Sequence, residues 1–144
     1  MFMRLVVDLT LPSEARLISR TRRLFSGYLE VFGASQETVS DVVLAVDEAC
    51  TNVVRHAFDG GPLADRPPFR LTAELSDDEL VVVIEDDGVG MPTHAIDLRP
   101  LDAEPEATSG RGLQIIRELM TSVDIETAPH RQGTRLEMRK DLRV

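Results

Sequence analysis

The chain has 144 residues, of which 42% are hydrophobic, and this is enough for one compact domain with a hydrophobic core. Twenty-five acidic against sixteen basic side chains give a net charge of −9, which argues against the basic surface that nucleic acid or an anionic membrane requires. No apolar run approaches the roughly 18 residues that cross a bilayer, and the first residues do not open a secretory signal. We therefore expect a cytoplasmic protein and a single domain over residues 1–144.

The N-terminal part of the chain predicts a strand followed by a helix. Residues 3–9 read as a short strand, and Pro12-Ser13-Glu14 gives an N-cap signal for a helix that runs to about Phe32, with Gly33 as its stop. This helix has a basic side, where Arg16, Arg20 and Arg23 recur at helical spacing. The arginines form either an ordinary solvated face or a docking surface for an acidic partner or a second subunit.

A second helix is predicted after Ser35, which can cap it. Apolar residues follow the i, i+3, i+4, i+7 spacing as far as Ala57, and their face is the predicted core. Cys50, the only cysteine, falls among them and is predicted to be a buried structural thiol. Glu48 and Asn52 lie one turn apart and point the same way from this helix, away from the centre of the apolar stripe. Alone, the pair is also what an ordinary solvated helix face carries.

Strands, a long loop and a third helix are predicted in the remainder. Residues 69–75 alternate as a half-buried strand does, and residues 80–84 are apolar throughout, which favours a central strand that is doubly covered or at least well buried. Residues 91–109 carry three prolines and little periodicity, so we predict a functional loop. A third helix follows, with two last strands near 122–127 and 134–139. This order predicts an α/β (α+β) two-layer sandwich, with a mixed sheet covered on one face by helices.

Two glycine clusters suggest a split nucleotide site. Asp87-Gly88-Val89-Gly90-Met91-Pro92 follows a buried strand; its glycines let the backbone approach a ligand, and its aspartate can accept a hydrogen bond from the exocyclic amine of adenine. The same run also makes a good turn. Gly110-Arg111-Gly112-Leu113 opens a helix, whose exposed amides favour bound phosphate, and Arg111 adds positive charge. Neither cluster is a Walker loop or a dinucleotide-binding fingerprint.

Together these motifs resemble the GHKL ATPase superfamily and, within it, the anti-sigma-factor serine/threonine kinases of the RsbW type. The resemblance covers nearly the whole chain. The N box looks like Asp47-Glu48-Ala49-Cys50-Thr51-Asn52 continuing to His56-Ala57-Phe58, the G1 box like residues 87–92, and the G2 box like residues 110–113. Gly133-Thr134 resembles the threonine-bearing element of the last strand. The resemblance implies a GHKL, or Bergerat-type, ATP-binding fold.

The resemblance also implies a role for each matching residue. Glu48 would be the general base, Asn52 would coordinate Mg²⁺ at the triphosphate of ATP, Asp87 would read the adenine amine, and Thr134 would support the adenine contact. Residues 91–109 would form the ATP lid. The other implied ATP-binding positions are Gly88, Gly90, Met91, Gly110, Arg111, Gly112 and Leu113.

The implied function is an ATP-dependent protein serine/threonine kinase that acts as an anti-sigma factor in a partner-switching circuit and regulates transcription. Its implied partners are an anti-sigma-factor antagonist, which it phosphorylates, and a sigma factor or other regulatory protein. Homodimerisation is also expected from the family, whereas neither nucleic acid nor membrane is expected as a partner.

The chain departs from the family in one place, because residues 101–109 contain three acids and no base, although some relatives place an arginine there. This departure favours an alternative, a non-catalytic ATP-binding module that sequesters a regulatory partner. The ATP-binding half of a sensor histidine kinase is a third reading, disfavoured because no separate dimerisation helices are predicted. A ligand-free α/β domain is the fourth.

Overall fold

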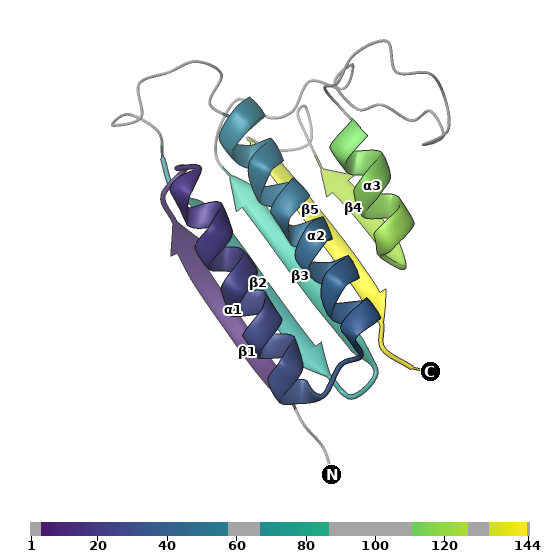
Figure 1. The fold of residues 1–144 in the computed structure, drawn as a ribbon. Coiled ribbons are helices and arrows are strands. Elements are labelled where there is room, and N and C mark those ends of the chain that lie inside the picture. The colour runs from purple at the N-terminus through teal and green to yellow at the C-terminus, as the bar shows by residue number, and fades with distance from the viewer. Residues whose placement is uncertain (1–3, 58–66, 87–110, 127–132, 144) are drawn as a thin grey trace.

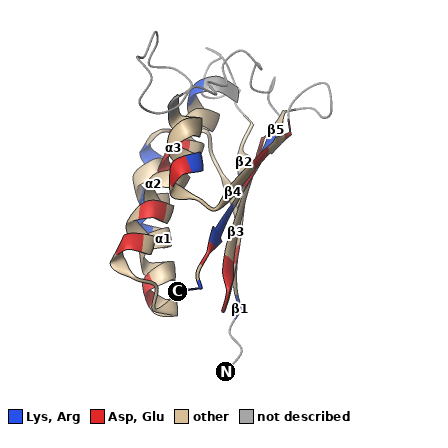
Figure 2. Ribbon diagram, turned by 90° about the vertical axis from the view of Figure 1, so that its right-hand side faces the viewer, with Lys and Arg blue, Asp and Glu red and all other residues tan. Residues whose placement is uncertain are grey.

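The computed structural model describes residues 4–57, 67–86, 111–126 and 133–143. Within these residues, three α-helices lie side by side over one face of a five-stranded sheet, as Figures 1 and 2 show from two sides. The two-layer arrangement and the α+β class predicted from the order of elements are therefore confirmed. No helix in the described ranges is both long and apolar enough to span a membrane.

In chain order the described elements are β1 (Arg4–Leu11), α1 (Arg16–Phe32), α2 (Gln36–Asn52), a π-helical turn (Val53–Ala57), β2 (Phe69–Ser76), β3 (Glu79–Asp86), α3 (Arg111–Leu119), β4 (Ser122–Glu126) and β5 (Thr134–Asp141). Each strand and helix coincides with one that the sequence predicted, with bounds that differ by a few residues.

The sheet has the strand order β1-β2-β3-β5-β4 and is antiparallel at each of these pairs, whereas the sequence predicted a mixed sheet. The reason lies in the path after β3. Helix α3 runs back along the sheet, so β4 starts at the far end and runs parallel to β3, and β5 then inserts between the two (Figure 1). Because β5 separates them, the parallel strands never become neighbours.

Strand β3 is central in the sheet, as its valine-rich sequence predicted, but the described helices cover only one of its faces (Figure 2). Its residues on the helix side, Leu80, Val82 and Ile84, are at most 1% exposed. On the opposite face Val81 and Val83 are half-buried among the side chains of neighbouring strands. The continuous apolar run therefore reflects a central place in the sheet rather than a second helical layer.

The hydrophobic core lies between the helices and the sheet. Its largest fully buried side chains are Phe25, Leu29, Leu71, Leu75, Leu80, Ile84, Leu113, Ile116, Met138, Val42, Val46 and Val82. Burying a side chain of this size contributes about 1.5–3 kcal/mol. Cys50 belongs to the same core, and burial raises the pKa of its thiol to about 12, which confirms the predicted unreactive structural cysteine.

The ends of the first two helices were predicted with mixed success. Gly33 ends α1 as predicted, with a left-handed φ of 91° that glycine adopts without steric cost. Ser35 caps α2, because its Oγ accepts a hydrogen bond from the Thr38 amide at 3.1 Å. The N-cap signal around Ser13 was wrong. Helix α1 begins only at Arg16, after Ala15, and has no side-chain cap; the buried Ser13 hydroxyl donates to the Pro67 carbonyl at 2.9 Å.

Tyr28, the only tyrosine, joins α1 to β1 through a hydrogen bond from its hydroxyl to the Leu5 carbonyl. Burial raises the pKa of Tyr28 to about 12, and the negative charge of Glu74 adds to the effect. In an alkaline absorbance titration we expect tyrosinate to form with a midpoint near 12 in the folded protein, against about 10 in urea.

Because the folded protein holds this proton more tightly, the stability that it contributes is present below about pH 10 and is lost as the pH rises toward the folded pKa of about 12. A Tyr28→Phe variant should lack this part of the decline in stability. A tyrosinate midpoint near the urea value in the folded protein would contradict the assignment.

Candidate functional site

The ends of four elements meet at one end of the molecule, where α2 and β3 finish and α3 and β5 begin (Figure 1). Glu48 and Asn52 lie on the last turns of α2, Gly112 on the first turn of α3, and Thr134 at the start of β5. The antiparallel topology therefore gathers motifs that are separated by more than half of the chain.

Helix α3 approaches α2 most closely at Gly112. A Cβ atom built on Gly112 would lie 2.9 Å from Glu48 Oε2 and 3.3 Å from Asn52 Nδ2, and real Cβ contacts essentially never fall below 3.0 Å. The atoms that it would meet are the ends of side chains, so a Cβ atom here would displace the Glu48 carboxylate, whereas glycine lets that carboxylate lie directly against α3. The structure thus brings the predicted general base, the predicted magnesium ligand and the second glycine cluster into direct proximity.

This contact changes the environment of the Glu48 and Asn52 pair. Asn52 is 9% exposed and Glu48 is half-buried, although both lie off the centre of the apolar stripe of α2. An amide and a carboxylate placed under a neighbouring helix differ from an ordinary solvated face, because their desolvation has to be offset by a bound partner or by hydrogen bonds. The burial of Glu48 and Asn52 therefore fits a ligand-binding site better than a solvated helix face.

Asp47, the acidic neighbour of Glu48 in the same motif, serves a different purpose. Its carboxylate pairs with Arg22 of α1 at 2.9 Å, and its backbone carbonyl accepts a hydrogen bond from the Thr51 hydroxyl at 2.8 Å. Asp47 therefore ties α1 to α2 beside the site and leaves Glu48 as the carboxylate of this motif that faces Gly112.

Helix α2 does not continue as an α-helix to Ala57, as its periodicity predicted, but changes after Asn52 into the π-helical turn. Such turns are frequent at functional sites. Arg55 lies within this turn, is exposed, and forms no ion pair with another described residue. Arg55 stands outside the motifs that predicted the site, although its position seven residues after Glu48 places it on the same side of a regular helix.

The end of β3 and the start of the neighbouring strand β5 form the other side of this region. Thr134 lies opposite Asp86 in the strand register, and the two are 7% and 3% exposed. Asp87 follows Asp86 directly in the sequence, so Thr134 starts β5 next to the point where the predicted adenine-reading residue leaves β3. Asp86 itself was missed, although the alternation of inward residues along β3 continues to it.

The structure describes only some of the remaining predicted site residues. Leu113 is 2% exposed and packs in the core, so its predicted phosphate contact concerns its backbone N–H alone. The backbone of Arg111 begins α3, whereas its side chain lies outside the described part. Outside the described residues lie Asp87, Gly88, Gly90, Met91 and Gly110.

The residues that the structure brings together suit Mg²⁺ in their chemistry. Magnesium prefers oxygen ligands and is commonly held by one or two protein groups together with substrate phosphates. Asn52 offers a buried amide oxygen beside the Glu48 carboxylate, and both lie against the first turn of α3 at Gly112. The N-terminus of a helix favours phosphate. Among the described residues no cluster of three or more histidine, cysteine or acidic side chains could hold a metal without such help.

Comparisons with known proteins identify the family and the fold. Residues 11–140 match the profile of the histidine kinase-like ATPase domain family. The serine-protein kinase RsbW of Listeria monocytogenes serotype 4a is 32% identical over 125 residues, which cover 83% of this chain and 78% of that protein. RsbW of Halalkalibacterium halodurans is 29% identical over 127 residues, which cover 83% of this chain and 75% of that protein.

Two solved structures share the fold. The RsbU and RsbW domains of a Mycobacterium tuberculosis protein superpose with a TM-score of 0.67 at 16% identity, over 96% of this chain and 32% of that one. The histidine kinase domain from Erythrobacter litoralis EL346 gives a TM-score of 0.56 at 23% identity, over 91% and 61% of the two chains. At these identities the likeness concerns the fold alone.

The close approach at Gly112 predicts the effect of adding one methyl group there. Glycine to alanine in a helix usually stabilises by up to about 1 kcal/mol, whereas overpacking costs about 1–3 kcal/mol. The new Cβ would lie 2.9 Å from Glu48 Oε2, the end of a flexible side chain that can move aside. We therefore expect Gly112→Ala to raise the free energy of unfolding, measured in urea, by less than the usual helix gain. In a Glu48→Ala background the same change should give the full gain. Equal effects in both backgrounds would refute the contact.

Proposed function

Because this chain belongs to the family of histidine kinase-like ATPase domains, we propose that it is an ATP-dependent protein serine/threonine kinase of the RsbW type. In this proposal it acts as one domain, phosphorylates an anti-sigma-factor antagonist and sequesters a sigma factor or other regulatory protein. The observation that carries the proposal is the meeting of Glu48 and Asn52 with the first turn of α3 at Gly112. The RsbW serine-protein kinases among its relatives support it.

In the proposed reaction, the first turn of α3 holds the phosphate groups of ATP. Backbone amides at a helix N-terminus and the positive end of the helix dipole both favour anions. Asn52 holds Mg²⁺ through its amide oxygen, and the ion supplies charge neutralisation at the triphosphate. Thr134 lies at the start of β5, opposite the end of β3, where the adenine would bind. Asp87 remains the predicted residue that selects adenine over guanine.

Glu48 acts as the general base. Its carboxylate accepts the proton of a partner serine or threonine hydroxyl while the hydroxyl oxygen forms a bond to the γ-phosphorus of ATP. The bond from that phosphorus to the oxygen that bridges it to the β-phosphate breaks, and ADP leaves. Because Glu48 Oε2 faces Gly112, the base stands next to the phosphate-holding amides, and positioning of this kind supplies most of the catalysis in phosphoryl transfer.

Arg55 is the candidate for the positive charge that the acidic stretch at residues 101–109 does not provide. It is exposed just beyond Asn52 and has no carboxylate partner among the described residues. An arginine is suited to phosphate because its planar group donates two parallel hydrogen bonds. We include it in the proposed site beside Arg111.

We assign the docking of an acidic partner to the exposed arginines of α1. Arg20 and Arg23 face solvent and form no ion pair within the described residues, while Arg16 pairs with Glu14. The pair between Arg22 and Asp47 holds this half of α1 beside the end of α2 that carries Glu48. A partner attracted to the arginines of an otherwise acidic protein would therefore arrive near the general base. Homodimerisation stays a prediction from the family.

Glu48→Gln is the decisive substitution for the kinase proposal. With ATP, Mg²⁺ and a cognate antagonist, we expect the wild type to produce a phosphoprotein and the variant to lower the rate about 100-fold or more, because the amide cannot accept the proton. The affinity for ATP, measured by isothermal titration, should change little. Glutamine retains the shape of the side chain, so a loss of folding is not expected.

Asn52→Ala serves as the contrasting variant, because it should lose Mg²⁺-dependent ATP binding itself. Nucleotide binding without any phosphoprotein in the wild type would reject the kinase and favour the alternative, a non-catalytic ATP-binding module that sequesters its partner. That alternative is motivated by the absence of a base in residues 101–109. No nucleotide binding in the wild type would reject both proposals.

Charge reversal on α1 tests the docking surface. We expect Arg20→Glu with Arg23→Glu to weaken partner binding at least tenfold at low salt, with a smaller loss at high salt because exposed charges are screened. ATP affinity should be unchanged. Arg4→Glu with Arg70→Glu is the matched control, since it changes the net charge by the same amount at two exposed arginines on β1 and β2. An equal loss of binding in the control would show that net charge alone, rather than α1, attracts the partner.

A further inference from the structure

Helix α3 has nine residues, and its two ends are held by different contacts. Its first turn carries Gly112 against α2, and its last turn lies toward the opposite end of the sheet (Figure 1). There the Lys140 ammonium of β5 donates to the Leu119 carbonyl at 2.5 Å and pairs with the Asp41 carboxylate of α2 at 3.2 Å. A single ammonium group therefore links α3, α2 and the sheet.

The environment of Lys140 makes these bonds stronger than surface contacts. Its side chain is 18% exposed and that of Asp41 is 27% exposed, so the pair is screened less than a solvated one. The Leu119 carbonyl is one of the last four of a helix, which lack partners within the helix and carry the negative end of its dipole. Lys140 supplies a hydrogen bond and a positive charge at this point.

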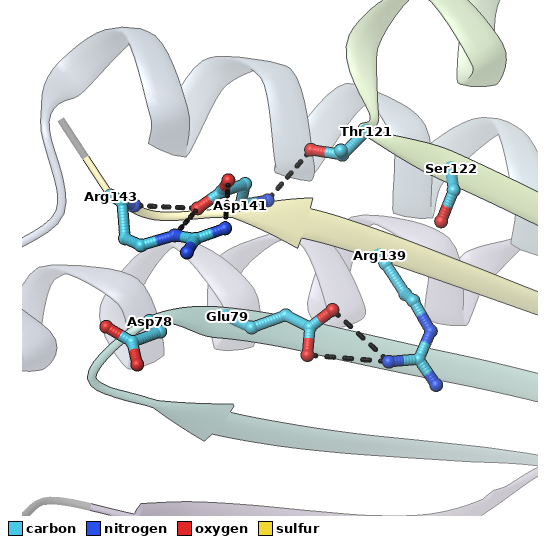
Figure 3. Close-up of a pocket in the computed structure, with 7 residues that line it drawn as sticks. All are labelled: Asp78, Glu79, Thr121, Ser122, Arg139, Asp141 and Arg143. Atoms are coloured by element: carbon cyan, nitrogen blue, oxygen red, sulfur yellow. Dashed lines mark hydrogen bonds and ion pairs between the residues drawn. The ribbon is translucent and has the colours of Figure 1, made fainter.

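The segment that follows α3 is attached to β5 independently of Lys140. The Thr121 amide donates to the Arg139 carbonyl at 2.8 Å, and the Asp141 amide donates to the Thr121 hydroxyl at 2.8 Å. Figure 3 shows the second of these bonds beside the pair between Arg139 and Glu79. Loss of the Lys140 side chain would leave the entry to β4 and the apolar packing of α3 in place and would remove the polar contacts of its last turn.

We propose that Lys140 is a positioning residue, which sets where the first turn of α3 lies against Glu48 and Asn52 and thereby sets nucleotide affinity. The inference rests on the proposed nucleotide site. Nine residues of α-helix span about 13 Å, so a tilt of about 5° about the last turn moves the first turn by about 1 Å. A displacement of that size at a catalytic group can cost about 100-fold in rate.

The test compares three variants at a temperature at which circular dichroism shows each to be folded. Lys140→Met retains the aliphatic stem and removes the ammonium, Lys140→Arg retains the charge and the donors, and Arg139→Met removes a neighbouring charge. Arg139 is the matched control because its side chain pairs with Glu79 on the face of the sheet away from the helices. We expect Lys140→Met to weaken ATP binding about tenfold, the scale of a hydrogen bond to a charged group. Lys140→Arg should recover most of the affinity, and Arg139→Met should stay within about twofold of the wild type.

Hydrogen exchange of the α3 amides provides a readout that needs no ligand. Lys140→Met should speed exchange in residues 112–119, and Arg139→Met should not. If the wild type binds no ATP, the proposed function fails, and the exchange result decides the positioning role by itself. Unchanged exchange and affinity in Lys140→Met would overturn the inference, as would equal effects in Arg139→Met.

Asp41→Asn guards against a Lys140→Met variant that does not fold. This substitution removes the charged partner and leaves the bond from the ammonium to the Leu119 carbonyl, so we expect a smaller loss of ATP affinity and faster exchange in α3. If the Lys140→Met variant does not fold, and Asp41→Asn changes neither the ATP affinity nor the exchange of the α3 amides, then Lys140 serves the fold alone and the inference is wrong.

Discussion

The packing of α3 on α2 at Gly112 is the constraint on which the candidate site depends. A Cβ atom on residue 112 would displace the Glu48 carboxylate, so glycine lets the Glu48 and Asn52 pair lie directly against α3. The same contact has two consequences. It covers a polar pair that its own helix would leave on the surface, and it brings the N-terminus of α3 beside a carboxylate and an amide oxygen. A base, a ligand for Mg²⁺ and an anion site thus arise from one helix contact.

The sheet makes this contact possible by deciding where α3 lies. Because β5 inserts between β3 and β4, the chain after β3 has to cross to the outer edge of the sheet, and α3 covers the sheet next to α2 on the way. At the far end of α3, Lys140 ties the helix to both neighbours. The protein is acidic overall, but α1 carries exposed arginines on its outer face. The hydrophobic core lies beneath the same helix.

Much of the candidate site could be predicted from local sequence, because its parts are local. The i, i+4 spacing fixes that Glu48 and Asn52 point the same way from one helix, and a glycine cluster before an amphipathic run predicts a helix start with free amides. Local patterns failed at two helix ends. Helix α1 begins only at Arg16 without a side-chain cap, while the Ser13 hydroxyl donates to the Pro67 carbonyl, and α2 changes into a π-helical turn after Asn52. Neither event has a signature in the neighbouring residues.

The sequence by itself determined the elements, the alternation of buried positions, the buried Cys50 and, through the order of its motifs, the family. Each of these depends on residue spacing along one helix or strand. Only the tertiary structure decided that the sheet is antiparallel, that Asp86 faces the helices opposite Thr134, and that Gly112 touches Glu48. It also showed that Lys140 joins three elements. These features depend on which segments become neighbours in space, and side-chain volume and strand insertion settle that choice only when the whole chain packs.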